Sequence, residues 1–180
     1  INWFFFSSTS HVYFSSKKKI SENFLIKPVS FYGLTKKLAE DYIIKKLNKT
    51  KLNYCIGRIF SISNKNHKKN FLVPELKKKI SHRKNTIILK DLNHYRDFIS
   101  TRDLSKIIMH LYKMRFKGVI NLGTGKAIHL KNIAKILAKK YGANIKFEDN
   151  KNPTHLIANI KKLKKIYKYN LLKKIEDRVF

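Results

Sequence analysis

Short apolar runs alternate along the chain with longer segments in which apolar residues recur every three or four positions. The runs are typical of buried strands, and the recurring positions are typical of amphipathic helices. Strands that alternate with helices favour an α/β fold with parallel strands. The predicted strands are residues 3–6, 52–60, 86–89, 97–99, 119–122 and 145–147, and the predicted helices cover residues 31–47, 74–80, 101–112, 130–141 and 160–167.

Polar residues mark the ends of several of these elements. Residues 7–10 (SSTS) follow the first apolar run and predict a loop, and residues 14–30 predict a second loop because they are polar and contain Pro28. Pro74 suits the first turn of a helix, where its missing N–H costs nothing. Thr101 is the expected cap of the helix that follows it.

The composition indicates a folded protein. With 43% hydrophobic residues in 180, the chain can bury a sizeable core, which excludes a wholly disordered protein. Since no apolar run approaches the roughly 20 residues of a membrane span, we expect no membrane partner. Cys55 is the only cysteine, which excludes an internal disulfide and suits a small core residue in a reducing cytoplasm. The seven histidines lack a metal-binding spacing, so we expect no metal.

The net charge of +30 raises the question of a nucleic-acid partner. Six of the 41 basic residues are arginine, the side chain that favours bidentate phosphate and base contacts. The lysines are spread along the chain, mainly on the polar faces of the predicted helices. We therefore interpret most of them as solvated surface and expect no nucleic-acid partner. A functional basic surface that attracts phosphorylated molecules is the alternative.

Tyr32 and Lys36 carry the most informative spacing, because residues four apart share one face of a helix. A phenol ionises near pH 10 and is a poor base at neutral pH. An ammonium group close by favours the phenolate, which then exchanges a proton with a sugar hydroxyl or carbonyl. Lysine-rich helices also produce this spacing by chance. The hydroxyls of residues 7–10 precede it and can bond the same substrate oxygen, although by themselves they are typical of a polar loop.

Several ordered motifs resemble the extended short-chain dehydrogenase/reductase family, the NAD-dependent epimerases and dehydratases of nucleotide sugars. Each motif is short, but their order and spacing cover nearly the whole chain. The resemblance implies a Rossmann-type parallel sheet with a small mixed α/β substrate-binding subdomain. The motifs are FSSTSHVY at 6–13, SENFLIKPVSFYGLTKKLAE at 21–40, GRIF at 57–60, NFLVP at 70–74, YRDFISTRDL at 95–104 and INLGTG at 120–125.

The resemblance implies a catalytic triad. Thr9 matches its Ser/Thr, Tyr32 its acid/base, and Lys36 the residue that bonds the nicotinamide ribose and assists the tyrosine. Tyr32 and Lys36 would thus also contact the cofactor. Ile59 and Phe60 match the strand end that runs beside the nicotinamide.

The resemblance also implies substrate contacts. Arg96 matches the arginine that binds the diphosphate of the nucleotide sugar, and its guanidinium suits phosphate oxygens. A surface ion pair with Asp97 or Asp103 is the alternative for this residue. Asn70 and Phe71 align with a segment that lines the sugar-nucleotide pocket.

The sequence lacks the Gly-rich fingerprint that binds a dinucleotide. Gly123-Thr124-Gly125 is not that loop, because Ile128 stands where a third glycine is needed. Since the chain also starts at Ile1, we expect the main cofactor-binding half to lie outside it. Residues 1–60 would then form the carboxy-terminal part of the Rossmann domain. Residues 61–180 would form mainly the substrate-binding subdomain, with elements that return to the Rossmann sheet.

Three further positions narrow the expected reaction. Ser10 and His11 stand where 4,6-dehydratases carry Asp-Glu, and Ser61 stands where many sugar epimerases carry Asn. We therefore expect an NAD- or NADP-dependent nucleotide-sugar epimerase or 4-keto-sugar reductase, homodimeric in its full-length form. The alternatives are a basic binding module without chemistry and an inactive truncated remnant. Only the enzyme would lose its activity when Tyr32 is replaced by Phe.

Overall fold

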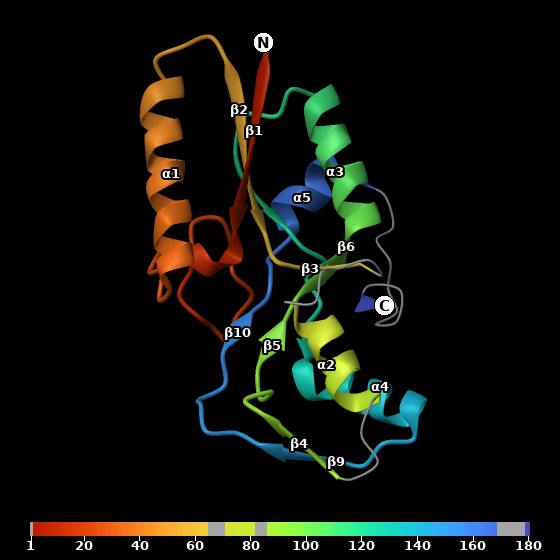
Figure 1. Cartoon of the computed structure of the whole chain (residues 1–180). Coiled ribbons are helices and arrows are strands. Elements are labelled where there is room, and N and C mark those ends of the chain that lie inside the picture. The colour runs from red at the N-terminus through yellow and green to blue at the C-terminus, as the bar shows by residue number, and fades with distance from the viewer. Residues whose placement is uncertain (1, 65–70, 82–85, 169–178) are drawn as a thin grey trace.

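The computed structural model describes residues 2–64, 71–81, 86–168 and 179–180. It forms two groups of elements, one around β1, β2 and β7 and one around β4, β9, α2 and α4 (Figure 1). In chain order the elements are β1 (Trp3–Thr9), the 3₁₀ helix η1 (Ser10–Val12), α1 (Phe31–Leu47), β2 (Asn53–Ile59), β3 (Ser61–Ser63), α2 (Leu72–Ser81), β4 (Ile87–Lys90), β5 (Tyr95–Arg96), β6 (Phe98–Ser100), α3 (Thr101–Lys113), β7 (Gly118–Leu122), β8 (Ile128–His129), α4 (Leu130–Tyr141), β9 (Ile145–Glu148), β10 (His155–Leu156) and α5 (Lys161–Ile166).

The expected parallel sheet is confirmed by the order β1–β2–β7, in which both pairs of strands are parallel. β1 is longer than predicted. Its pairing with β2 continues through Ser8, which lies opposite Arg58, to Thr9, which lies opposite Ile59. The prediction of a loop at residues 7–9 was therefore wrong, because backbone pairing and buried partners for the hydroxyls favour the extended conformation.

Helices cover both faces of this sheet (Figure 1). α1 packs on one face, and α3 and α5 pack on the other. The second face buries Cys55 together with Ile107 and Leu111, which the helical pattern placed on the inner side of α3. Burial raises the pKa of the Cys55 thiol to about 12, which agrees with the predicted core residue.

The second group of elements surrounds the parallel pair β4–β9, against which α2 and α4 pack. Leu76 and Ile80 of α2 and Ile133 and Leu137 of α4 are buried together, as their spacing predicted. A small sheet in the order β10–β5–β8 contains the one departure from parallel pairing in the described sheets, because β5 and β8 are antiparallel.

The segment between η1 and α1 confirms the predicted loop, although it is firmly packed. Two isolated bridges fix it, one between Tyr13 and Ile26 and one between Ile20 and Ala158. Tyr13 and Ile20 are almost completely buried, in a third cluster that includes Phe60. This loop therefore connects β1 to α1 along a defined path.

The start of α3 corrects one prediction. Ser100 is the N-cap, since its Oγ accepts a hydrogen bond from the backbone N–H of Asp103 at 3.0 Å, and Thr101 is the first helical residue. The division of the chain at residue 60 stays a prediction, although β7 pairs with β2 from beyond that point. No helix within the described ranges is long and apolar enough to cross a membrane.

Candidate active site

The carboxyl end of β1 begins the candidate site. Thr9 is its last residue, and its side chain is almost completely buried. The Thr9 Oγ1 accepts a hydrogen bond from the backbone N–H of His11 at 3.3 Å and so caps η1. In open parallel sheets, ligands bind at the carboxyl ends of the strands, which is where Thr9 lies.

The first turn of α1 lies directly against η1. The Ser30 Oγ caps the helix by accepting a hydrogen bond from the Gly33 N–H at 3.1 Å. A Cβ atom at Gly33 would lie only 2.3 Å from the carbonyl oxygen of His11. Gly33 therefore permits a backbone approach that any other residue would prevent. This contact brings Tyr32 next to the end of β1.

Tyr32 and Lys36 form one edge of the site. Tyr32 is 53% exposed, and its hydroxyl makes no hydrogen bond with any described residue. The Lys36 Nζ donates to the carbonyl oxygen of Ser7 at 2.8 Å and lies 6.0 Å from the centre of the Tyr32 ring. Thr9, Tyr32 and Lys36 are therefore all placed at the carboxyl end of β1, with Tyr32 open to an incoming molecule.

His11 is a neighbour of these residues that the sequence did not single out as a site residue. Its ring lies edge-on to Tyr32, with ring centres 6.1 Å apart. Burial, followed by the positive charge of Arg96, lowers the pKa of His11 below its usual value. The imidazole is thus neutral at pH 7 and able both to donate and to accept a hydrogen bond. Its position two residues after Thr9 was the available signal.

Arg96 lies in β5, and its positive charge acts on His11. Its Nη1 donates to the carbonyl oxygens of Tyr95 and Thr154, and its Nη2 donates to the Thr154 Oγ1 at 2.9 Å. Its guanidinium is thus held by Tyr95 and Thr154, and the role of Arg96 stays a prediction.

The Asp97 carboxylate is hydrogen-bonded to other segments of the chain. It accepts hydrogen bonds from the backbone and hydroxyl of Thr124 and from the backbone N–H of Gly125 and of Ala158. Burial nevertheless raises the pKa of Asp97 above its usual value. The backbone N–H groups of Thr124 and Gly125 thus bind a buried carboxylate of the chain itself.

The remaining predicted site residues do not all lie at the candidate site. Ile59 ends β2 opposite Thr9 and is half-buried, whereas Phe60 is 5% exposed and packs against the Tyr13 ring. Phe71 precedes α2 and is 44% exposed. Asn70 lies outside the described residues. The structure therefore brings Ile59 to the candidate site and turns Phe60 toward the core.

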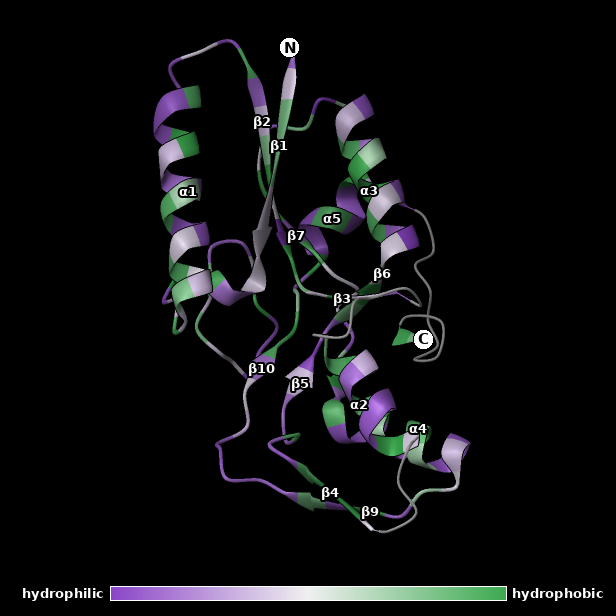
Figure 2. Ribbon diagram, viewed as in Figure 1, coloured by the Kyte–Doolittle hydropathy of each residue, from purple (hydrophilic) through white to green (hydrophobic). Residues whose placement is uncertain are grey.

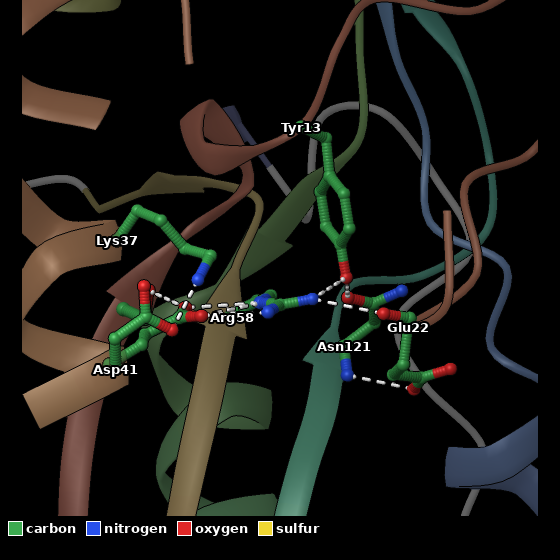
Figure 3. Close-up of polar contacts among 8 residues, drawn as sticks. Tyr13, Glu22, Lys37, Asp41, Arg58 and Asn121 are labelled. Carbon is green, nitrogen blue, oxygen red and sulfur yellow. Dashed lines mark hydrogen bonds and ion pairs between the residues drawn. The ribbon is translucent and has the colours of Figure 1, made fainter. Parts of the chain in front are cut away.

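Behind the site lies a buried polar cluster that the sequence did not predict, which we call the Arg58 network (Figure 3). Glu40 is completely buried and Arg58 is 5% exposed. Sequence reasoning expects such charges at the surface, because they are seldom fully buried unless paired. The available signal was the position of Glu40, four residues after Lys36 on the same face of α1. The network contains Ser8, Tyr13, Glu22, Glu40, Arg58 and Asn121.

A parallel sheet covered by helices on both faces, with a tyrosine and a lysine at its carboxyl edge, is the Rossmann-type arrangement of nicotinamide-dependent oxidoreductases. The model of the GDP-mannose 4,6 dehydratase family matches residues 2–178, so the chain belongs to this family of extended short-chain dehydrogenase/reductase enzymes that act on nucleotide sugars. The resemblance seen in the sequence is thereby confirmed.

Curated relatives agree with this assignment. The chain is 29% identical over 163 residues to a dTDP-4-dehydro-6-deoxyglucose reductase of Escherichia coli, with 86% of the chain and 50% of the relative covered. It is 31% identical over 134 residues to a GDP-6-deoxy-D-talose 4-dehydrogenase of Aggregatibacter actinomycetemcomitans, with 73% of the chain and 45% of the relative covered. The chain thus spans about half the length of these relatives.

A solved structure agrees with the fold. RMD from Pseudomonas aeruginosa, complexed with NADPH, superposes with a TM-score of 0.87 at 16% sequence identity. The match covers 98% of this chain and 63% of that one. At this identity the likeness speaks for the fold alone.

Proposed function

We propose that the protein carrying this chain is an NAD(P)-dependent oxidoreductase that reduces the 4-keto group of a nucleotide sugar. One observation carries the proposal: the Lys36 Nζ donates to the carbonyl oxygen of Ser7, two residues before Thr9, and lies 6.0 Å from the centre of the Tyr32 ring. The names of both curated relatives, a 4-dehydro-sugar reductase and a 4-dehydrogenase, support position 4 of the sugar.

The described residues suit the nicotinamide end of the cofactor. Lys36 presents an ammonium group at the carboxyl edge of the sheet, where it would bond the nicotinamide ribose together with Tyr32. Ile59 ends the neighbouring strand and offers an apolar contact for the nicotinamide ring. When bound, NAD(P)H supplies the hydride. No Gly-rich fingerprint occurs in the sequence, so these residues account for only one end of the cofactor.

The chain's own groups would handle the proton. Tyr32 would donate its phenolic proton to the C4 carbonyl oxygen as the hydride arrives at C4, so that the keto group becomes a hydroxyl. Thr9 would orient this oxygen with its hydroxyl. Lys36 would stabilise the phenolate left behind, which is then reprotonated from solvent. Arg96 would bind the substrate diphosphate, because its guanidinium is suited to phosphate oxygens.

The same residues would also serve an epimerase, the second reaction that the sequence left open. There Tyr32 first removes the hydroxyl proton, and the keto sugar turns over before the hydride returns. The two reactions differ in their cofactor balance. A reductase consumes one NAD(P)H for each sugar, which lowers the absorbance at about 340 nm, whereas an epimerase causes no net change. Ser61, in place of the epimerases' asparagine, favours the reductase.

We also propose that the full-length protein is a homodimer that pairs through α1. Four apolar side chains form a stripe on this helix, and each is at least 46% exposed. A continuous apolar stripe of this kind marks an interaction surface. The residues of the α1 stripe are Phe31, Leu34, Leu38 and Tyr42.

Replacement of Tyr32 by Phe tests the proposed chemistry. We expect Y32F to lower kcat by about 10²–10⁴-fold, because it removes the proton donor and no described hydrogen bond. Y42F is the matched control, because Tyr42 is exposed on the same helix ten residues further on. The measurement is steady-state reduction of 4-keto nucleotide sugars by the natural full-length protein. A fully active Y32F would exclude the assignment and favour a binding role without chemistry.

A further inference from the structure

The Arg58 network is centred on a buried ion pair. The Arg58 Nη2 donates to the Glu40 Oε2 at 2.7 Å, and the Nε donates to both carboxylate oxygens, at 3.0 and 3.2 Å. Glu40 also accepts a hydrogen bond from the Ser8 hydroxyl. Burial is the largest single effect on the pKa of Arg58 and lowers it. The hydrogen bond to Glu40, together with the other interactions with Glu40 and Tyr13, outweighs burial, so the pKa of Arg58 is raised above its ordinary value.

The other side of Arg58 binds the loop that connects β1 to α1. The two hydrogens of its Nη1 are donated to the Tyr13 hydroxyl at 2.9 Å and to the Glu22 carbonyl oxygen at 3.0 Å. Burial raises the pKa of Tyr13 to about 12, so its phenol remains protonated and donates to the Asn121 Oδ1 of β7 at 2.7 Å. One guanidinium therefore joins α1, β2 and the loop, and through Tyr13 it reaches β7 (Figure 3).

Glu40 continues the face of α1 that bears the candidate catalytic residues. Tyr32, Lys36 and Glu40 follow one another at intervals of four residues, so they share one side of the helix. Lys36 bonds the backbone of Ser7, and Glu40 accepts the hydroxyl of Ser8. These two contacts are made to consecutive residues of β1, directly before Thr9.

We propose that Glu40 and Arg58 are positioning residues, which fix α1 along β1 and thereby hold Tyr32 and Lys36 in register with Thr9. Neither touches the substrate or the cofactor. The inference rests on the proposed function, because it concerns the geometry of the same site. Ser8 and Arg58 are opposite one another in the parallel pair β1–β2, so Glu40 bonds both strands at the same level.

A purely structural role for the ion pair makes a different prediction. Replacing a buried ion pair by apolar side chains of similar volume is often neutral or stabilising, whereas removing one partner is strongly destabilising. If the pair served only the fold, an apolar pair with native stability would have native activity. If the pair sets the position of α1, the apolar pair keeps the fold and loses rate, because it has no directional bonds to Ser8 and Tyr13.

The experiment compares three variants of the natural full-length protein. E40Q removes the charge but keeps the shape, and E40M/R58M replaces the pair by apolar side chains of similar length. D41N is the matched control, because it removes a carboxylate from the exposed Lys37–Asp41 ion pair at the next position of α1 (Figure 3). We measure kcat, KM, the pH profile of kcat/KM and the melting temperature, together with the ¹³Cζ resonance of Tyr32, assigned by its loss in Y32F.

We expect E40M/R58M to melt near the native temperature, to lose at least about tenfold in kcat and to keep KM within about threefold. The Tyr32 resonance should shift in E40Q and in the double variant, and stay in place in D41N. If neither variant folds, E40D and R58K keep the charges and shift them by about one bond length, and the same loss of kcat at native melting temperature is expected.

Folded variants with native kcat and an unshifted Tyr32 resonance would overturn the inference. The Y32F result separates this outcome from failure of the proposed function. If Y32F is inactive while E40M/R58M is fully active, the proposed chemistry stands and the positioning role is wrong. If Y32F is fully active, the proposed function fails and the positioning role fails with it.

Discussion

Gly33 is the residue on which the contact between α1 and η1 depends. A β carbon at this position would lie 2.3 Å from the His11 carbonyl oxygen and 3.3 Å from the Pro28 Cβ. The first of these neighbours is a backbone atom, which has no rotamer by which to move away. The close contact places the Tyr32 ring against the His11 ring, so one absent methyl group shapes the edge of the candidate site.

Substitution of Gly33 by Ala is therefore expected to destabilise the protein. In an open helix the change would stabilise by about 1 kcal/mol through helix propensity. Forcing a methyl group into a filled space costs about 1–3 kcal/mol, and a backbone neighbour places this case near the upper end. We expect a lower melting temperature for G33A than for the wild type, and little change for K45A, at an exposed position of the same helix outside the α1 stripe. A G33A variant as stable as the wild type would contradict this, because it would show that η1 moves away from the added methyl group at little cost in free energy.

The sequence allowed Thr9, Tyr32 and Lys36 to be grouped as one site. It did not show that His11 and Glu40 lie close to them. Tyr32 and Lys36 are one helical turn apart, so local spacing alone places them together. His11 meets Tyr32 only because Gly33 permits two backbone segments to touch, a contact with no periodic signal. Glu40 was hidden because a glutamate in a lysine-rich helix predicts a solvated face, and its arginine partner lies on a strand 18 residues away.

At the scale of elements, α1 differs from the other long helices. Hydrophobic and hydrophilic residues are mixed around it, and Figure 2 shows both kinds on successive turns. Its completely buried charge, Glu40, faces the sheet, whereas the apolar α1 stripe faces outward. The sequence correctly predicted the helix, but Leu38 and Tyr42, two of its regularly spaced apolar residues, are exposed and are not core residues.

A glutamate in the α1 stripe tests the proposed dimer. We expect L38E to shift the full-length protein from dimer to monomer, because it places a charge at a position that the partner helix would cover. Sedimentation velocity measures the change. I88E is the control, since Ile88 is similarly exposed, at 52% against 59%, but lies on β4. A monomeric wild type would contradict the proposal, as would an L38E variant that remains a dimer.

The elements that the sequence missed are the shortest. β3, β5, β8 and β10 contain two or three residues each, too few for a period to be visible. Long helices such as α3 and α4 were predicted within a few residues because several turns repeat the same apolar face. The end of β1 was misread because Ser7–Thr9 have loop-like composition, and their partners come from Arg58 and Glu40 elsewhere in the chain.

For the whole molecule, four histidines share one electrostatic property. Burial is the leading cause that lowers the pKa of each, and nearby positive charges contribute, Arg96 for His11 and His94, Lys131 for His129 and Lys17 for His155. His129 and His155 also stack on the two faces of the Tyr95 ring, each at 4.5 Å. The fold thus favours the neutral form of these four imidazoles.

Stability is therefore expected to fall as the pH is lowered from about 7.5 to about 5. An unfolded histidine takes up its proton near pH 6.5, whereas these folded ones resist protonation, so acid favours the unfolded state. Melting temperatures across this range give the slope. Asp97 has the opposite effect on stability, because burial raises the pKa of this carboxyl group and the folded state therefore binds its proton more tightly. The experiment compares H129N and H155N with the wild type, which isolates the contribution of the histidines. Both should flatten the decline, and an unchanged slope would contradict the prediction.

The Arg58 network has a consequence for the order in which the protein folds during its synthesis. Tyr13 and Asn121 are hydrogen-bonded although 108 residues separate them. During synthesis, Thr9, Tyr32 and Lys36 leave the ribosome long before β7 exists to complete the network behind them. Native contacts of such long range form late in folding. A nascent chain that already contains every predicted catalytic residue would therefore still lack the complete Arg58 network behind them, because the bond from Tyr13 forms only when Asn121 has been translated.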